Sequence, residues 1–290
     1  MGDWAEAIRR VFTLYSECVG YDFINQQNNE RVLYFEISSI KKVEQKQQPQ
    51  QPKEICERYM CMDMEALLKY INFMGTQLVR LDLGPVYEAT GPDRMFARSP
   101  KDGNPIYSPW HLDCDMNEVT LFSNDKRRKL DSNGGVASVA AKPRPCCGVQ
   151  KTCCAICWNS LAIPLIKACI STCQRLYNCR PHVFASGQKG LHFWVPSPKL
   201  AAATDKITRT KIFDWFLKCI VCELEDNHNL RVNGFKLFDS ACTTGPTHMI
   251  RMPWSIHNET GRRVIELNLD DEASWEYNTV ITRSQALNLI

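Results

Sequence analysis

The sequence has no long hydrophobic run, no large excess of either charge and no internal repeat. No run approaches the ~20 apolar residues of a membrane span. The first residues, MGDWAEAIRRVFTLYSE, lack the apolar stretch and small-residue cleavage site of a secretory signal. We therefore expect a soluble, intracellular protein with no membrane partner.

The charge balance alone does not indicate a nucleic-acid partner. The chain has 35 Lys and Arg against 32 Asp and Glu, a net charge of +3, so any basic surface must be local. Its 290 residues are 44% hydrophobic, which is enough for a large core. Disulfide scaffolds are short secreted chains with poor cores, so we expect most of the 15 cysteines to be reduced and one cluster to bind metal.

Helical and strand-like patterns are interleaved along the chain without a regular βαβ repeat, which predicts an α+β fold with a mixed sheet. Asp3 is expected to cap the first predicted helix. Pro164 is expected to kink the third predicted helix or to end its first turn. The predicted helices cover residues 3–15, 63–74, 158–176 and 211–224. The predicted strands cover residues 31–37, 78–87, 110–119, 183–195 (folded back at 186–190), 234–239, 248–253 and 262–267. Residues 44–53, which are rich in Gln and Pro, and residues 123–145 are predicted loops.

Two carboxylates share one face of the strand predicted over residues 110–119. Side chains alternate with a period of two, so Asp113 and Asp115 lie about 7 Å apart on the same face. Two divalent cations about 4 Å apart can bridge such a pair. Asp239, at the end of a predicted strand, is the candidate third ligand. A solvated strand face and a surface acid are the simpler alternatives.

The segment from Ser186 to His192, SGQKGLH, has the composition of an anion-binding turn. Its two glycines allow close backbone approach, and its hydroxyl, ammonium and imidazole groups can contact one phosphate. An ordinary hairpin turn fits equally well. His248, Arg251 and His257 add cationic donors soon after Asp239.

Four cysteines form the pattern CC-x6-C-x2-C: Cys146, Cys147, Cys154 and Cys157. Four thiolates can hold a structural Zn²⁺ in a closed tetrahedral site. The alternative is a reduced, partly buried cysteine cluster. The basic run KRRK at residues 126–129 could contact nucleic acid or direct nuclear import, but it also fits a solvated surface.

Taken in order, five segments resemble motifs of the catalytic small subunit of archaeo-eukaryotic-type DNA primases. They are DLGPVY, LDCDM, CC-x6-C-x2-CW, SGQKGLHFWV, and FDS followed by HMIRMPWSIHNETGR. The resemblance spans residues 29 to 265. It implies a single catalytic domain over residues 1–290, with a mixed-sheet core related to RNA-recognition-motif folds. The resemblance further implies that this domain contains a structural zinc motif at 146–157 and a small helical insertion around 199–230.

The resemblance also implies roles for individual residues. Two catalytic ions, Mg²⁺ or Mn²⁺, would be held by Asp113, Asp115 and Asp239. The incoming nucleotide would be bound by Ser186, Gly187, Lys189, His192, Arg251 and His257, with Arg31 also reaching it and Asp82 contacting the ribose. Gln188 departs from the family pattern, which often has a basic residue at that position.

The implied function is synthesis of short RNA primers from ribonucleoside triphosphates on a single-stranded DNA template. The implied partners are a large primase subunit and, in a eukaryote, a replicative DNA polymerase. The protein would be located in the nucleus if it came from a eukaryote or from a virus with a eukaryotic host. One alternative is a primase-polymerase that uses deoxynucleotides in repair or restart. Another is a zinc-containing nucleic-acid-binding subunit with a decayed active site.

Overall fold

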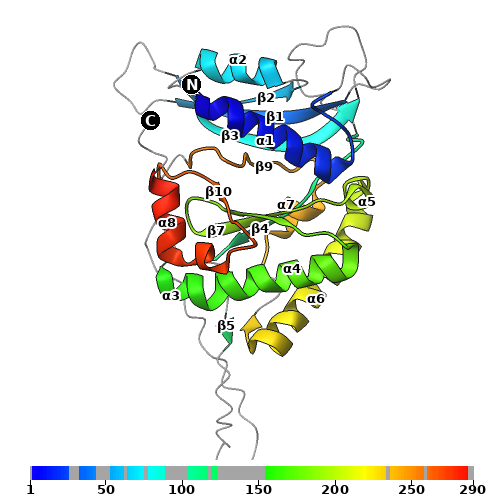
Figure 1. The fold of residues 1–290 in the computed structure, drawn as a ribbon. Helices are drawn as coiled ribbons and strands as arrows, with labels where there is room; N and C mark the ends of the chain where they lie inside the picture. Colours follow the sequence, from blue (N-terminus) through cyan, green and yellow to red (C-terminus); the bar gives the residue numbers. More distant parts are fainter. Residues whose placement is uncertain are drawn as a thin grey trace, which may run out of the picture.

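The computed structural model has two four-stranded sheets, one above the other, with helices packed on both (Figure 1). Every strand pairing among the described residues is antiparallel. The α+β prediction is therefore confirmed, whereas the predicted mixed sheet is wrong. The structure describes residues 2–25, 33–43, 53–61, 64–74, 78–88, 104–116, 119, 121–122, 154–232, 236–257 and 260–286.

The upper sheet has the strand order β2-β1-β3-β9. Its strands are β1 (Leu33–Val43), β2 (Lys53–Cys61), β3 (Leu78–Glu88) and β9 (Ile250–Arg251). Helices α1 (Gly2–Val19) and α2 (Met64–Met74) share one apolar cluster with this sheet. Strand β2 was not predicted, and the Gln-rich stretch before it lies outside the described residues. Helix α1 begins at Gly2, so Asp3 lies in its first turn rather than at its cap.

The lower sheet has the strand order β10-β6-β7-β4. Its strands are β4 (Trp110–Asp115), β6 (His182–Ala185), β7 (Gly190–Val195) and β10 (Ile265–Glu266). The predicted alternation is confirmed: Leu112 and Cys114 are buried in the core on the helix side, whereas Asp113 and Asp115 lie on the other face. The predicted hairpin at 186–190 joins β6 and β7.

A continuous helical segment runs under the lower sheet from α3 (Ala155–Cys157) through a π-helical turn (Trp158–Ala162) to α4 (Ile163–Tyr177). In the wide turn the N–H of Ile163 donates to the carbonyl of Trp158. The segment does not end at Pro164, which follows the π-helical turn and leaves one helical hydrogen bond unmade because it has no N–H. By length and hydropathy this segment could cross a membrane, contrary to the expectation that no run approaches such a span, but it is half buried in the core. It is therefore a core helix.

The remaining elements complete the lower half. They are α5 (Pro198–Ala201), α6 (Lys206–His228), the pair β5 (Leu121–Phe122) and β8 (Arg231–Val232), α7 (Ser240–Thr244), a 3-10 turn (Glu272–Trp275) and α8 (Tyr277–Ala286). Helices α5 and α6 fall where the helical insertion was expected. The strand predicted over residues 234–239 is wrong: its described part, residues 236–239, is a turn before α7. Helix α8 was not predicted.

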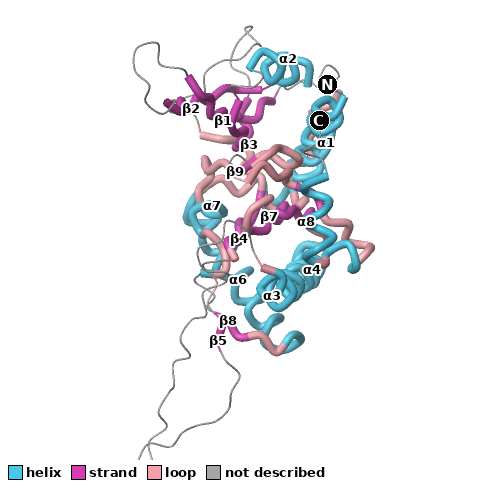
Figure 2. The backbone as a smooth tube through the Cα atoms, turned by 90° about the vertical axis from the view of Figure 1, so that its left-hand side faces the viewer, coloured by secondary structure: helices cyan, strands magenta, loops and turns pink. Residues whose placement is uncertain are grey.

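Helix α1 connects the two sheets. The hydroxyl of Tyr15 donates to the Gly84 carbonyl of β3 at 2.7 Å, and its ring lies 5.7 Å from that of Trp194 on β7. Figure 2 shows that β9, the edge strand of the upper sheet, and the loops beside it lie on the side nearest the lower sheet. Polar groups from both halves can therefore meet around β9.

Candidate active site

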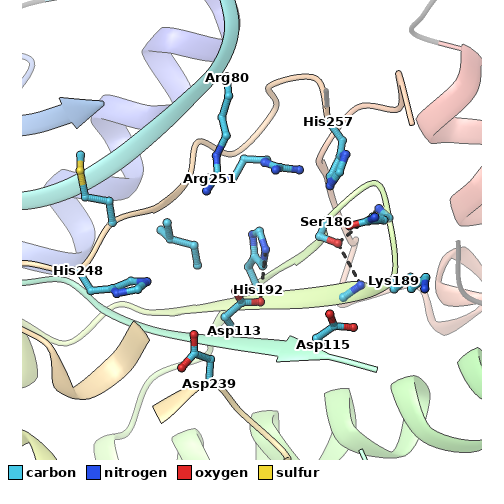
Figure 3. Close-up of a pocket in the computed structure, with 14 residues that line it drawn as sticks. Arg80, Asp113, Asp115, Ser186, Lys189, His192, Asp239, His248, Arg251 and His257 are labelled. Carbon is cyan, nitrogen blue, oxygen red and sulfur yellow. Dashed lines mark hydrogen bonds and ion pairs between the residues drawn. The ribbon is translucent and has the colours of Figure 1, made fainter. Parts of the chain in front are cut away.

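A polar pocket of about 320 Å³ lies where β4 and β7 of the lower sheet face β3 and β9 of the upper sheet (Figure 3). This volume is in the range of pockets that bind small ligands. It is lined by Arg80, Asp113, Asp115, Ser186, Gln188, Lys189, Gly190, His192, Asp239, His248, Met249, Ile250, Arg251 and His257. The pocket thus contains eight of the predicted site residues, drawn from distant parts of the chain.

Three carboxylates form one wall of this pocket (Figure 3). Asp113 and Asp115 project from β4, and Asp239 stands at the start of α7. The backbone N–H of Asp239 donates to the carbonyl of Asp113 at 2.8 Å, which fixes the start of α7 against β4. The side chain of Asp239 accepts a hydrogen bond from the N–H of Ala241 at 2.9 Å and so caps α7. The structure therefore brings the three acids into one pocket.

The carboxyl group of Asp113 is largely buried and lies beside two other acids. Burial, followed by the charges of Asp239 and Asp115, raises the pKa of Asp113 to about 6. Hard divalent cations prefer carboxylate oxygens, so the donor chemistry fits Mg²⁺ or Mn²⁺. In the described part of the chain, however, no three His, Cys, Asp or Glu side chains are arranged around a single metal position. The three acids therefore share the pocket without forming a closed site for one ion.

Cationic groups form the facing wall (Figure 3). Arg251 comes from β9 and Arg80 from β3, where its Nε lies 2.6 Å from the carboxylate of Asp82. Sequence reasoning missed Arg80. The signal was present, because Arg80 and Asp82 are two residues apart in a predicted strand and so share a face. His248, considered only as a nearby cationic donor, also lines the pocket.

The turn between β6 and β7 closes one end of the pocket. Ser186 Oγ accepts hydrogen bonds from the N–H groups of Gly190 at 3.0 Å and Gln188 at 3.4 Å, which fold the turn on itself. Gly190 faces β4 so closely that an added Cβ would lie 2.7 Å from the carbonyl oxygen of Cys114. A side chain at this position would therefore push the turn away from the acids.

His192 stands between the acids and the arginines. Its Nε2 lies 3.6 Å from Asp113 Oδ1. Burial and then the charge of Arg251 lower the pKa of His192 to about 3, so its ring is neutral near pH 7. The contact with Asp113 is thus a polar contact rather than an ion pair, so His192 does not offset the negative charge of the acids.

Asp82, the predicted ribose contact, lines a second, adjoining pocket of about 550 Å³. The two pockets share Arg80, His248 and Met249. The structure therefore places Asp82 next to the acidic pocket but not in it.

Three other predicted site residues, Arg31, Cys146 and Cys147, lie outside the described residues. Of the expected zinc ligands, Cys154 and Cys157 are described, and the N–H of Cys157 donates to Cys154 Sγ at 3.5 Å. None of the cysteines whose side chains the structure describes forms a disulfide.

No protein-family model matches the sequence, and no curated protein matches it. Among solved structures, the chain is similar to the polymerase domain from Mycobacterium tuberculosis Ligase D in complex with DNA. The sequence identity is 10% and the TM-score 0.45, over 98% of this chain and 87% of that chain. A likeness at this level assigns no function to the pocket.

Proposed function

We propose that the chain is a two-metal nucleotidyl transferase of the primase kind, which starts RNA chains from ribonucleoside triphosphates on single-stranded DNA. The observation that carries the proposal is the pocket itself. In this pocket of about 320 Å³, three carboxylates from β4 and the start of α7 face a set of cationic and turn residues. Nucleotidyl transfer needs this pairing, because it requires both a metal site and a cradle for a highly charged triphosphate.

Each wall has its own part in this reaction. Asp113, Asp115 and Asp239 would hold the divalent cations, which would lower the barrier to attack by a 3′-hydroxyl and neutralise the leaving pyrophosphate. Lys189 and Arg251 would bind phosphate oxygens by charge-assisted hydrogen bonds. In the adjoining pocket, Asp82 would accept hydrogen bonds from the sugar. Arg80 would hold the Asp82 carboxylate in position through the 2.6 Å contact between Arg80 Nε and Asp82 Oδ1.

The acid assignment can be tested with matched variants. Asp239→Asn and Asp113→Asn should each reduce dinucleotide synthesis more than about a hundredfold, a loss of about 2.7 kcal/mol of transition-state stabilisation. Asp271→Asn is the control, since Asp271 also accepts a hydrogen bond from the N–H two residues ahead but lies outside both pockets. Normal thermal unfolding of all three would exclude misfolding. Unchanged synthesis in either pocket variant would reject the metal assignment.

The sugar preference needs a separate experiment. Purified protein is given an unprimed single-stranded template, Mg²⁺ or Mn²⁺ and all eight nucleotides. Oligomers that begin with a ribonucleotide would support the proposal, and exclusive use of deoxynucleotides would favour a primase-polymerase of repair or restart. Template binding without any synthesis would favour a non-catalytic nucleic-acid-binding subunit.

We also propose a structural Zn²⁺ held by Cys146, Cys147, Cys154 and Cys157. The combined change Cys154→Ser and Cys157→Ser should remove about one bound zinc per chain, measured by mass spectrometry of the metal content, and lower the thermal midpoint. Nucleotide affinity should change little, because a closed site has no open coordination position. A full zinc content after both changes would refute the ligand set. Partners of the primase kind, a large subunit and a replicative polymerase, remain part of the proposal.

A further inference from the structure

The turn over residues 186–190 has a front that faces the pocket and a back that is packed against another loop. Ser186 and Lys189 line the pocket. Gly187 adopts a left-handed conformation, with φ of +80°, and a Cβ added there would lie 3.0 Å from the carbonyl oxygen of Arg262 and 3.2 Å from Cβ of His257. The back of the turn therefore packs against His257 and Arg262, which stand at the two sides of the next loop.

Thr260 links this loop to the turn by a direct hydrogen bond. Its hydroxyl donates to the carbonyl oxygen of Gly187 at 2.8 Å and accepts a hydrogen bond from the N–H of Arg262 at 3.3 Å. The side chain is half-buried. One hydroxyl group thus satisfies a backbone acceptor of the turn and a backbone donor of the loop.

Backbone hydrogen bonds also join the described residues on the two sides of this loop. The N–H of His257 donates to the Arg262 carbonyl at 2.7 Å, and the N–H of Gly261 donates to the His257 carbonyl at 2.8 Å. Ile256 also forms an antiparallel bridge with Arg263. Because the His257 side chain lines the pocket, the position of the turn relative to this loop sets how far Lys189 lies from His257.

We infer that Thr260 is a positioning residue, whose hydroxyl holds the 186–190 turn so that Ser186 and Lys189 meet a triphosphate in register with His257. This inference rests on the proposed function, in that it takes the ligand to be a nucleoside triphosphate. Groups held in place before binding do not have to be ordered by the ligand, so affinity is gained without a new contact. Thr260 itself need not touch the nucleotide.

The test compares three substitutions at one position with a matched control elsewhere. Thr260→Val keeps the shape and removes the hydroxyl, Thr260→Ala does so with less bulk, and Thr260→Ser keeps the hydroxyl. Thr210→Val is the control, since Thr210 on α6 donates to the Lys206 carbonyl with the same 2.8 Å length but lies outside the pocket. Binding of inorganic tripolyphosphate and of ATP with Mg²⁺ is measured by calorimetry, which does not require turnover.

Thr260→Val should weaken binding of both probes about tenfold, the effect expected for one hydrogen bond, whereas Thr260→Ser and Thr210→Val should stay within about twofold. If the chain polymerises, KM for the nucleotide should rise by a similar factor with kcat nearly unchanged, because the turn binds ground state and transition state alike. In a Lys189→Met background, Thr260→Val should weaken binding of the probes by about twofold or less, because the turn no longer carries the ammonium group that Thr260 helps to position.

Wild-type affinity in Thr260→Val would overturn the inference, as would an equal loss in Thr260→Ser. If Thr260→Val does not fold, Thr260→Ala decides by the same criteria. A wild-type chain that binds tripolyphosphate but makes no oligomer would refute the proposed function and leave the role of Thr260 intact. A wild-type chain that binds neither probe would overturn the role of Thr260.

Discussion

Replacing Gly187 by alanine should impair the pocket without removing any polar group. Gly187 has φ of +80°, a conformation that costs an L-residue about 1–2 kcal/mol. The new methyl group would also lie 3.0 Å from the Arg262 carbonyl oxygen and 3.2 Å from His257 Cβ, and crowding of this kind costs about 1–3 kcal/mol more. Together these terms lower the free energy of unfolding by about 2–5 kcal/mol.

Two other glycines separate the contributions to this loss. Gly261 has φ of +66° with nothing within 4 Å of an added Cβ, so Gly261→Ala should cost only the conformational term, about 1–2 kcal/mol. Gly20 has φ of +71°, and its added Cβ would lie 2.8 Å from Pro198 Cγ. Gly20→Ala should therefore be destabilised about as much as Gly187→Ala, but at the end of α1 and away from the pocket.

The assays are urea unfolding for stability and nucleotide incorporation for activity, at a temperature where all variants are folded. Gly187→Ala should lose about tenfold in kcat/KM, because displacing binding groups by about 1 Å can cost about 100-fold and the crowding requires a smaller shift. Gly20→Ala should stay within about twofold of wild type. Equal losses of activity in these two variants would refute the argument, because the defect would then follow stability rather than the position of the turn.

Two further predictions concern groups outside the pocket. Burial disfavours the charged form of His182, but hydrogen bonds to Glu266 and Glu17 outweigh it and raise its pKa. The contribution of His182 to the free energy of unfolding is therefore complete below its ordinary pKa of about 6.5 and is lost as the pH rises through the raised value. Urea unfolding from about pH 5.5 to about pH 9 should show this decline in stability. The decline should be smaller in His182→Gln. Arg209 is fully buried and donates to four backbone carbonyls, so Arg209→Met should lower the free energy of unfolding by about 3–5 kcal/mol. A loss under about 1 kcal/mol by thermal or urea unfolding would show that those carbonyls find other partners.

The parts of the site that could be predicted from the sequence were those set by local periodicity. Strand alternation placed Asp113 and Asp115 on one face of β4, and the two glycines of SGQKGLH marked the hairpin between β6 and β7. Period two could also have paired Arg80 with Asp82 on β3. These features depend on residues a few positions apart, where backbone geometry alone decides which side chains share a face.

The parts that could not be predicted depend on tertiary packing. Leu237 and Phe238 suggested a strand, yet they are buried in a turn, and Asp239 reaches the acids through a cap and a backbone hydrogen bond to Asp113. Sheet order and strand direction are set by contacts far apart in the sequence, so the mixed sheet was wrongly expected. Helix α8 has too weak an apolar stripe to be recognised before its partners are known.

The π-helical turn over Trp158–Ala162 holds one residue more than an α-helical turn would. The wider turn absorbs this extra residue, so α3 and α4 keep nearly the relative rotation of one uninterrupted α-helix. Deleting one residue inside the turn should therefore restore α-helical spacing and leave the direction of Cys154 and Cys157 nearly unchanged, whereas deleting one residue from α4 should rotate the upstream end of the helix by about 100°. Length changes of one residue during evolution or engineering should be tolerated better at these five positions than in the α-helical turns that follow them.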